Sequence, residues 1–390
     1  MAAILMMGSL VLTSCDDDDD EDDQPTPQPS DNVITSNITT NTTWTTGNTY
    51  VLGGRIAVTA GNTLEIQPGV IVKGQAGTGA NATALLIARG AKIDAQGTET
   101  QPIIFTSVAD EIEPGMVASP NLDPDLNGLW GGLIILGNAP ISADDDAVQI
   151  EGIPPSDQNG LYGGTDAADD SGILRYVSIR HGGSNIGEGN EINGLTLGGV
   201  GNSTVIENIE IVGNQDDGIE WFGGTVNVTN ALVWNAGDDA IDTDQSWSGT
   251  LNNFIVVNPG DECFELDGPE GTLDAEHTIT NGTVFAGDAD GLVDLDPNSR
   301  LIMSDIYFFG LSAGQDFDEL PVPAEGGFGD FMNFEATIPA GEAVSDYFLD
   351  GSADFTVNVA EGANTVGANA SSFNTWSWAS VSGALTDLGL

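Results

Sequence analysis

Acidic side chains recur at a fixed distance from an asparagine in four consecutive stretches of this chain. The anchoring asparagines are Asn208, Asn230, Asn253 and Asn281. The ninth residue after each anchor is acidic in all four stretches: Asp217, Asp239, Glu262 and Asp290. The twelfth residue is acidic in the first three stretches: Glu220, Asp242 and Glu265. Because Ca²⁺ takes carboxylate oxygens as ligands, stacking these stretches side by side would build a calcium site.

The spacing of the anchors predicts how the stretches are arranged. Successive anchors are 22, 23 and 28 residues apart, and each is followed at the tenth and eleventh positions by a small and then an apolar residue. Such a repeat is too short for a helical hairpin, and its apolar residues fall in short β-branched runs. This pattern is typical of an all-β solenoid, the parallel β-helix, whose coils lie about 4.8 Å apart. The four anchors are then expected to form a ladder of bonded side-chain amides, and Cys263, at a small position, is expected to be packing.

The stacked acids have two interpretations, and the sequence leaves both open. Carboxylates about 5 Å apart repel by about 3 kcal/mol at an effective dielectric constant near 20. Aspartate forms good turns, so the acids can be a solvated turn face that counter-ions screen. Alternatively, raised pKa values or bound Ca²⁺ offset the repulsion. The predicted calcium ligands are Asp217, Glu220, Asp239, Asp242, Glu262 and Glu265, with Asp216, Asp238 and Asp261 as further candidates.

The composition excludes partners that need a basic surface. The chain has 390 residues, of which 60 are Asp or Glu and 7 are Lys or Arg, and its formal net charge is −53. We therefore expect it to bind no nucleic acid. Hydrophobic residues make up 40% of the chain, which is enough for a packed core and separates it from acidic disordered polymers.

The first 34 residues predict export and anchoring rather than folding. Residues 1–15 form an apolar run ending in LTSC, which is similar to a bacterial lipobox with Cys15 as the lipidated residue. The run is too short to span a bilayer as a helix, and no Lys or Arg precedes it. Residues 16–34 open with eight consecutive acids and continue with a Pro-rich stretch, so a disordered tether is expected.

Coil-like patterns occupy most of the remaining chain. The predicted β-helix spans residues 35–310, and the polar segments 108–126 and 142–172 are expected to project from it as loops. Residues 311–390 are expected to hold the last coils and a C-terminal cap. Within them, residues 373–383 are expected to cover the open end of the stack, because exposed strand edges invite pairing with other chains.

Several long motifs resemble a family of Bacteroidetes surface lipoproteins. The motifs are GLWGGLIILGNAPI, LYGGTDAADDSGILRYVSIRHGG, GLTLGGVGNSTVIENIEI, DDGIEWFGGTVNV and WSWA. The resemblance implies a right-handed parallel β-helix of the pectin-lyase-like superfamily. It also implies a lipid anchor in the outer membrane and a position facing the cell exterior, and the acidic run after Cys15 looks like the export signal of such lipoproteins. It implies no activity, because the family has none assigned.

The favoured function is a non-catalytic binding or structural one: glycan binding, adhesion, or service to another surface or outer-membrane protein. Exposed aromatic rings stack on sugars, and the candidate ligand-binding residues are Trp234, Trp247 and His181. Trp221 shares the parity of the core residue Ile219 and is expected to be buried.

The alternative function is that of a carbohydrate-active enzyme, either a polysaccharide lyase or a hydrolase. A lyase needs a base and a cation, and basic residues cluster only at Arg175, Arg180 and His181, where a turn histidine is the simpler interpretation. Asp238 and Asp239 are similar to the paired aspartates of polygalacturonases, yet the other motifs of that family are absent from the sequence. The sequence therefore favours binding over catalysis.

Overall fold

The computed structural model describes residues 32–77, 79–187 and 190–390. Cys15 and residues 16–31 of the predicted tether lie outside the described residues. Strand β1 (Val33–Ile34) pairs in parallel with β3 (Thr49–Leu52), so the coils begin before the expected end of the tether at residue 34. In the described part of the chain, no helix has both the length and the apolar composition that crossing a bilayer requires.

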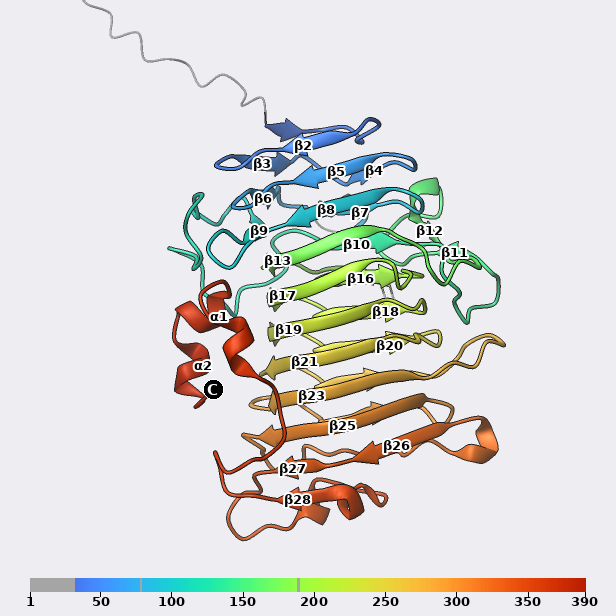
Figure 1. The fold of residues 1–390 in the computed structure, drawn as a ribbon, viewed down its shortest axis with the longest axis vertical. Coiled ribbons are helices and arrows are strands. Elements are labelled where there is room, and N and C mark those ends of the chain that lie inside the picture. Colours follow the sequence, from blue (N-terminus) through green and yellow to red (C-terminus); the bar gives the residue numbers. More distant parts are fainter. Residues whose placement is uncertain (1–31, 78, 188–189) are drawn as a thin grey trace, which may run out of the picture. The chain divides into compact units, whose positions relative to one another are not determined.

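Strands of successive coils stack in parallel into two sheets within the described residues (Figure 1). The larger sheet contains β1, β2 (Thr42–Trp44), β3, β5 (Thr63–Ile66), β6 (Ile71–Gly74), β8 (Lys92–Gln96), β9 (Ile103–Ser107), β13 (Gly172–Arg180), β17 (Val205–Asn214), β19 (Asn227–Ala236), β21 (Thr250–Val257), β23 (His277–Phe285), β25 (Arg300–Phe309), β26 (Phe328–Met332), β27 (Phe334–Ala336) and β28 (Thr356–Asn358). The smaller sheet contains β4 (Ile56–Val58), β7 (Leu85–Ile87), β10 (Leu133–Leu136), β16 (Leu195–Gly198), β18 (Ile219–Phe222), β20 (Ile241–Asp244), β22 (Phe264–Leu266) and β24 (Asp294–Leu295). The predicted right-handed parallel β-helix is confirmed.

Short hairpins and helical turns decorate the stack. Apart from Gly172, where β13 begins, the two projecting segments contribute nothing to either large sheet. The hairpins β11 (Val148–Gln149) with β12 (Leu161–Tyr162) and β14 (Ser184–Gly187) with β15 (Asn190–Ile192) are antiparallel. The 3₁₀ turns are η1 (Gly79–Asn81), η2 (Gln158–Gly160), η3 (Pro323–Glu325), η4 (Val344–Asp346), η5 (Ser352–Phe355) and η6 (Ala370–Phe373). The α-helices are α1 (Trp378–Val381) and α2 (Ala384–Asp387).

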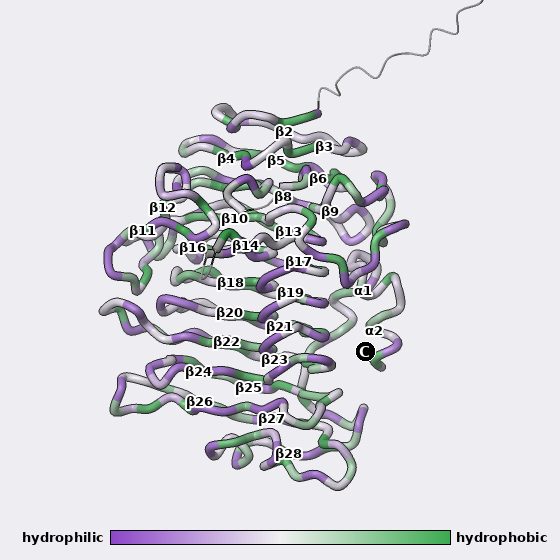
Figure 2. Tube along the Cα trace, turned by 180° about the vertical axis from the view of Figure 1, so that it is seen from behind, coloured by the Kyte–Doolittle hydropathy of each residue, from purple (hydrophilic) through white to green (hydrophobic). Residues whose placement is uncertain are grey.

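The larger sheet bends, so each coil has three faces around one core. Both β8 and β9 pair with β13, the former with residues before Tyr176 and the latter with residues after it. We call the half before the bend the first face, the half after it the second face, and the smaller sheet the third face. Alternate residues of each strand point inward, and Figure 2 shows both polar and apolar stretches along the coils.

Aromatic rings fill the middle of the core. The indoles of Trp221 and Trp247 stack with centroids 4.6 Å apart, and Trp247 stacks in turn on the His277 ring at 5.2 Å. Trp247 is fully buried and donates from Nε1 to the Val226 carbonyl at 3.0 Å. Cys263 is also buried, as its small position predicts.

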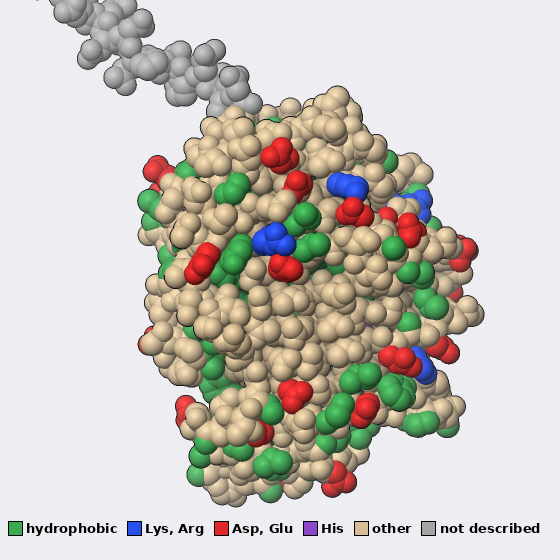
Figure 3. Space-filling model, in the orientation of Figure 1, with side chains coloured by type: hydrophobic (Ala, Val, Ile, Leu, Met, Phe, Trp, Pro, Cys, Tyr) green, Lys and Arg blue, Asp and Glu red, His purple; other side chains and the backbone are tan. Residues whose placement is uncertain are grey.

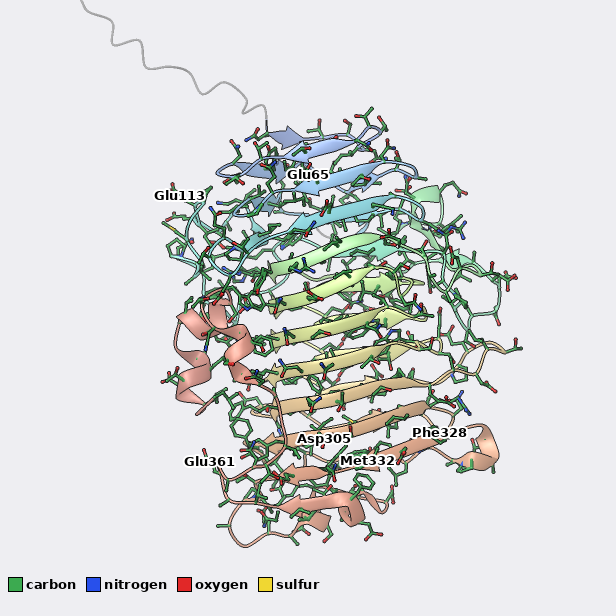
Figure 4. All side chains as sticks on the ribbon, in the orientation of Figure 1. Glu65, Glu113, Asp305, Phe328, Met332 and Glu361 are labelled. Carbon is green, nitrogen blue, oxygen red and sulfur yellow. The ribbon has the colours of Figure 1, made fainter. Side chains whose placement is uncertain are left out.

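Asparagines in the left-handed conformation make the bend between the first and second faces. The four anchors have φ of 58° or 59°, a region that asparagine tolerates better than most residues. Asn230 donates to Asn208 at 2.8 Å, and Asn253 donates to Asn230 at 2.6 Å. The bend continues at Asp305 on β25 (Figure 4), which accepts from Asn333 at 3.1 Å. The fourth anchor departs from the ladder, because Asn281 donates to Asn252 instead of Asn253.

Replacing Asn230 with alanine is expected to destabilise the protein by about 1–3 kcal/mol. The change removes two amide hydrogen bonds and places a Cβ residue without a local hydrogen bond at positive φ. Asn230→Gly removes the same bonds, but glycine adopts positive φ without steric cost. It should therefore recover part of the lost free energy of unfolding. Urea unfolding of both variants checks this, and an alanine variant as stable as the parent would contradict it.

The C-terminal segment does not cover the end of the stack, so the prediction for residues 373–383 is wrong. Residues beyond Gly310 first continue the coils through β26, β27 and β28. The chain then returns along the second face, where Phe373 and Trp376 pack against outward side chains of β19 and β21. Figure 1 shows α1 and α2 beside the stack rather than beyond it. The reason is that Leu232, Ile255 and Val257 point outward from the second face and need an apolar cover.

Candidate metal centre

The repeated acids lie on the third face, where the strand register aligns them. Glu220 pairs with Asp242, Asp242 with Glu265, and Glu265 with Asp294, across β18, β20, β22 and β24. In a strand the inward residues alternate with these acids, and Ile219, Ile241 and Phe264 fill the core beside them. Figure 2 shows these four strands stacked in order.

The acids at the ninth position satisfy backbone groups between coils. An Asp217 carboxylate oxygen accepts from the Asp239 amide at 3.0 Å, and an Asp239 oxygen accepts from the Glu262 amide at 2.7 Å. Each carboxylate thereby holds the corner of the next coil. Asp217 and Asp239 therefore stabilise turns, as one of the two interpretations of the sequence proposed.

Three carboxylates converge within this face. One oxygen each from Asp217, Glu220 and Asp242 lie within 4.8 Å of one another, and the residues are 8, 5 and 8% exposed. Two oxygens that each lie about 2.4 Å from one ion are at most about 4.8 Å apart, so this spacing suits Ca²⁺. Asp216, Asp217 and Asp238 form a second such group that shares Asp217.

The six predicted ligands are only partly brought together. Asp217, Glu220 and Asp242 converge, whereas Asp239, Glu262 and Glu265 lie on the same face outside both three-residue groups of the described chain. Glu262 and Glu265 are also partly exposed. Of the further candidates, Asp216 and Asp238 join the second group.

Burial makes ionisation of these carboxyl groups unfavourable. Burial, followed by the charges of neighbouring acids, raises the pKa of Glu220 and Asp242 well above its usual range. Burial also raises the pKa of Asp217 well above that range. The same causes raise the pKa of Asp216 to about 9, and burial with the Asp217 charge raises that of Asp239 to about 12. The groups would hold protons at neutral pH unless a cation replaced them.

An amide from a distant part of the chain points into the converging carboxylates. Asn193 is fully buried, and its Nδ2 donates to a Glu220 oxygen and approaches a Glu151 oxygen at 3.5 Å. Its Oδ1 is buried without a hydrogen-bond partner in the described structure. Burial raises the pKa of Glu151 to about 7. A buried amide oxygen without a donor, on a side chain that contacts a buried carboxylate, is a ready ligand for a hard cation.

The sequence comparison places the chain in a family. A family model described as a pectate-lyase-like β-helix domain matches residues 36–319. The chain belongs to this family. Among solved structures, it is similar to the pectin methylesterase from Aspergillus niger, at 11% identity over 87% of each chain and a TM-score of 0.34. No curated protein matches the sequence.

In this pectate-lyase-like β-helix, the basic side chains have partners away from the converging acids. Arg175 pairs with Glu207 at 3.0 Å, Lys92 with Asp170 and Arg300 with Glu276 at 2.5 Å each, and Arg55 with Asp157 at 3.6 Å. Lys73 and Arg89 donate to backbone carbonyls at 2.6 and 2.7 Å. Arg180 is buried against Glu210. The two three-residue acidic groups therefore contain no basic partner among the described residues.

None of the three predicted ligand-binding side chains has an exposed ring on which a ligand could stack, so that prediction is wrong. Trp247 is a core residue, because its coil turns the ring inward onto Trp221. Trp234 points outward but lies under the C-terminal segment, with its ring 5.9 Å from that of Trp378. His181 is buried at a bend with φ of 57°, and its Nδ1 bonds the Leu126 carbonyl at 2.6 Å.

Sequence reasoning missed Glu151 and Asn193 as part of the acidic centre. Both come from connections outside the regular repeat, and folding brings them to Glu220 from positions 27 or more residues away in the chain. The sequence offered one weak signal, since Asn193 lies two residues before β16, the strand that pairs with β18. A sequence repeat identifies residues that recur in every coil. It cannot identify residues such as Glu151 and Asn193, which occur in only one connection.

Proposed function

We propose that this protein is a non-catalytic binding and structural protein of the cell surface whose third face is loaded with Ca²⁺. The observation that carries the proposal is the convergence of the Asp217, Glu220 and Asp242 carboxylates, buried together without a basic partner in the described structure. A divalent cation would offset their mutual repulsion and accept the free Asn193 oxygen.

Calcium binding is expected to fall at least about tenfold in Asp242→Asn. The substitution removes one of three charged ligands but keeps the shape of the side chain, so the apo protein should fold at least as stably as the parent. Isothermal titration with CaCl₂ at pH 8 measures the affinity. Asp330→Asn, at an exposed acid of β26, is the matched control because it removes one charge elsewhere. Equal affinity in the two variants would reject the site.

The surface location is proposed from the N-terminal sequence. LTSC followed by eight acids supports lipid attachment at Cys15 and a tether that holds the β-helix away from the outer membrane. Cys15→Ser in the full-length chain is expected to move most of the protein from the membrane fraction to the soluble fraction on cell fractionation. Protease treatment of intact cells separately tests exposure to the exterior, and protection of the wild-type chain would contradict it.

A binding role is preferred to catalysis because the histidines that would act as bases are buried. His181 and His277 are both buried, and burial lowers the pKa of each. A lyase would need an accessible base beside the bound cation. Partners that suit the proposal are a glycan or another outer-membrane or surface protein.

A further inference from the structure

A shallow surface cavity, wide open to solvent, lies where the fourth asparagine departs from the ladder. The Oδ1 of Asn253 accepts from the Asn369 backbone amide at 2.6 Å rather than from the next asparagine of the ladder. Asn281 instead donates to Asn252, one residue earlier on β21, at 2.8 Å. The cavity has a volume of about 320 Å³ and lies between the ladder and the C-terminal segment. Its lining includes Asn230, Asn252, Asn253, Asn281, Asn369 and Ser372.

The cavity is lined by uncharged polar groups. No lining residue is acidic or basic, although the chain carries a formal net charge of −53. Figure 3 shows that the middle of the viewed face is also almost free of charged side chains. A polyanion, a cation or a strongly apolar ligand would find no complementary group in this lining. The occupant that fits is a neutral molecule with both hydrogen-bond donors and acceptors.

Several lining atoms are free to bind such a molecule. Asn252 uses its Oδ1 to accept from Asn281, which leaves its Nδ2 without a partner in the described structure. Asn281 donates from its Nδ2 to Asn252, and its Oδ1 has no hydrogen-bond partner among the described residues. Asn369 accepts from the Ser371 hydroxyl at 2.7 Å and keeps its Nδ2 free. The Asn281–Asn252 and Ser371–Asn369 hydrogen bonds orient these amides before any ligand arrives, which lowers the entropy cost of binding.

We propose that this cavity binds one or two units of a neutral glycan through its hydroxyl groups. A sugar hydroxyl both donates and accepts, so vicinal hydroxyls can pair with the Asn252 amide and the Asn281 oxygen together. The volume lies at the lower end of the range of roughly 300–1,000 Å³ that small-molecule sites occupy. The inference deepens the proposed binding role by naming a ligand class, but its site is separate from the calcium-binding face.

The test titrates the calcium-loaded protein with three neutral disaccharides, cellobiose, β-1,4-mannobiose and xylobiose, and with digalacturonate as the acidic comparison. Saturation-transfer NMR detects binding, and chemical-shift or calorimetric titration gives the affinity. We expect at least one neutral disaccharide to bind with Kd on the order of 1 mM, because the lining offers hydrogen bonds and no aromatic ring. Digalacturonate should bind at least about tenfold more weakly.

Two variants decide whether the binding occurs in this cavity. Asn252→Asp keeps an oxygen that can accept from Asn281 but replaces the free donor with a charged acceptor oxygen, so sugar affinity should fall at least about fivefold while the bond to Asn281 remains. Asn369→Ala removes a second donor with the same expected result. Asn202→Asp is the matched control, because Asn202 is exposed and its side chain has no hydrogen-bond partner in the described structure.

The outcomes separate this inference from the calcium proposal. Absence of binding by all three neutral disaccharides, or binding that both cavity variants leave unchanged, overturns the glycan site. Binding of triglycine with the same dependence on Asn252, in place of the sugars, also overturns it in favour of a peptide site. Calcium affinity measured in the same variants should equal that of the parent, so failure of the glycan site leaves the calcium test unaffected.

Discussion

Adding 1 mM CaCl₂ to the chelator-treated protein at pH 8 is expected to raise its melting temperature by on the order of 5 °C. A ligand at 100 times its Kd stabilises the folded state by about 2.7 kcal/mol, which corresponds to a shift of this order in a chain of this size. The physical reason is that Ca²⁺ binds the ionised Asp217, Glu220 and Asp242 of the folded state, and the unfolded chain offers no such group.

The same prediction has a defined pH dependence. Burial raises the pKa of Asp238 to about 6, of Glu262 to about 7, of Asp244 to about 8 and of Asp216 to about 9. Between about pH 4, where the unfolded acids titrate, and these values, the folded protein holds more protons than the unfolded chain. Stability without calcium should therefore be greatest near pH 4–5 and fall as pH rises toward 9.

Calcium should reverse this fall, because it competes with protons for the same oxygens. The calcium-dependent rise in melting temperature is expected to be large at pH 8 and close to zero at pH 5. Scans with CaCl₂, with MgCl₂ and with chelator, all at one ionic strength, check this. An equal rise with both salts, or an equal rise at both pH values, would indicate screening of surface charge and reject the bound ion.

Glu210→Ala is expected to destabilise the protein by about 3–5 kcal/mol, since it leaves the charge of Arg180 buried without its partner. Both side chains are fully buried, with Arg180 Nη2 3.6 Å from a Glu210 oxygen. Ser178 bridges them, donating to Glu210 at 2.5 Å and accepting from Arg180 at 2.7 Å. The C-terminal segment closes over the pair: the Trp378 ring covers the guanidinium at 4.9 Å, and the Ala379 amide donates to Glu210 at 2.9 Å.

The matched control lies on the same strand. Glu207 pairs with Arg175 at 3.0 Å, but the two side chains are 43% and 35% exposed, so Glu207→Ala should cost less than about 1 kcal/mol. Replacing both members of the buried pair, as Arg180→Met with Glu210→Leu, should recover most of the stability, because no uncompensated charge remains. Urea unfolding of the three variants measures these differences. Equal losses in the two single variants would show that the pair is not a stabilising contact.

The repeat made the fold predictable from the sequence. The offsets from Asn208 to Asp217 and Glu220 recur because each coil repeats one geometry. Residues that share an offset in the sequence therefore stack on one another in successive coils. The path of residues 373–390 was not predictable in this way. The apolar residues that it covers, such as Leu232 and Ile255, read as core in the sequence, and only the register shows that they point outward.

The candidate metal centre was predictable in part for the same reason. The sequence identifies the acids that share an offset, but it cannot say how deeply each one is buried. Asp242 and Glu265 occupy equivalent positions in neighbouring coils, yet Asp242 is buried and Glu265 is partly exposed. Glu220, one coil before Asp242, is contacted by the connection that carries Glu151 and Asn193, and the course of that connection depends on tertiary packing that no local pattern encodes.

The C-terminal segment also determines the order in which this molecule can be completed during synthesis. A stack of coils touches only its neighbours, so each coil can settle as soon as the next one has been made. Here residues made late bind coils made much earlier, since Thr375 bonds Glu99 across 276 residues of chain and Ala379 bonds Glu210. The cover over Arg180 and the second face can therefore form only after residues 373–379 have been made. The fold is completed when this late segment joins coils that have already formed.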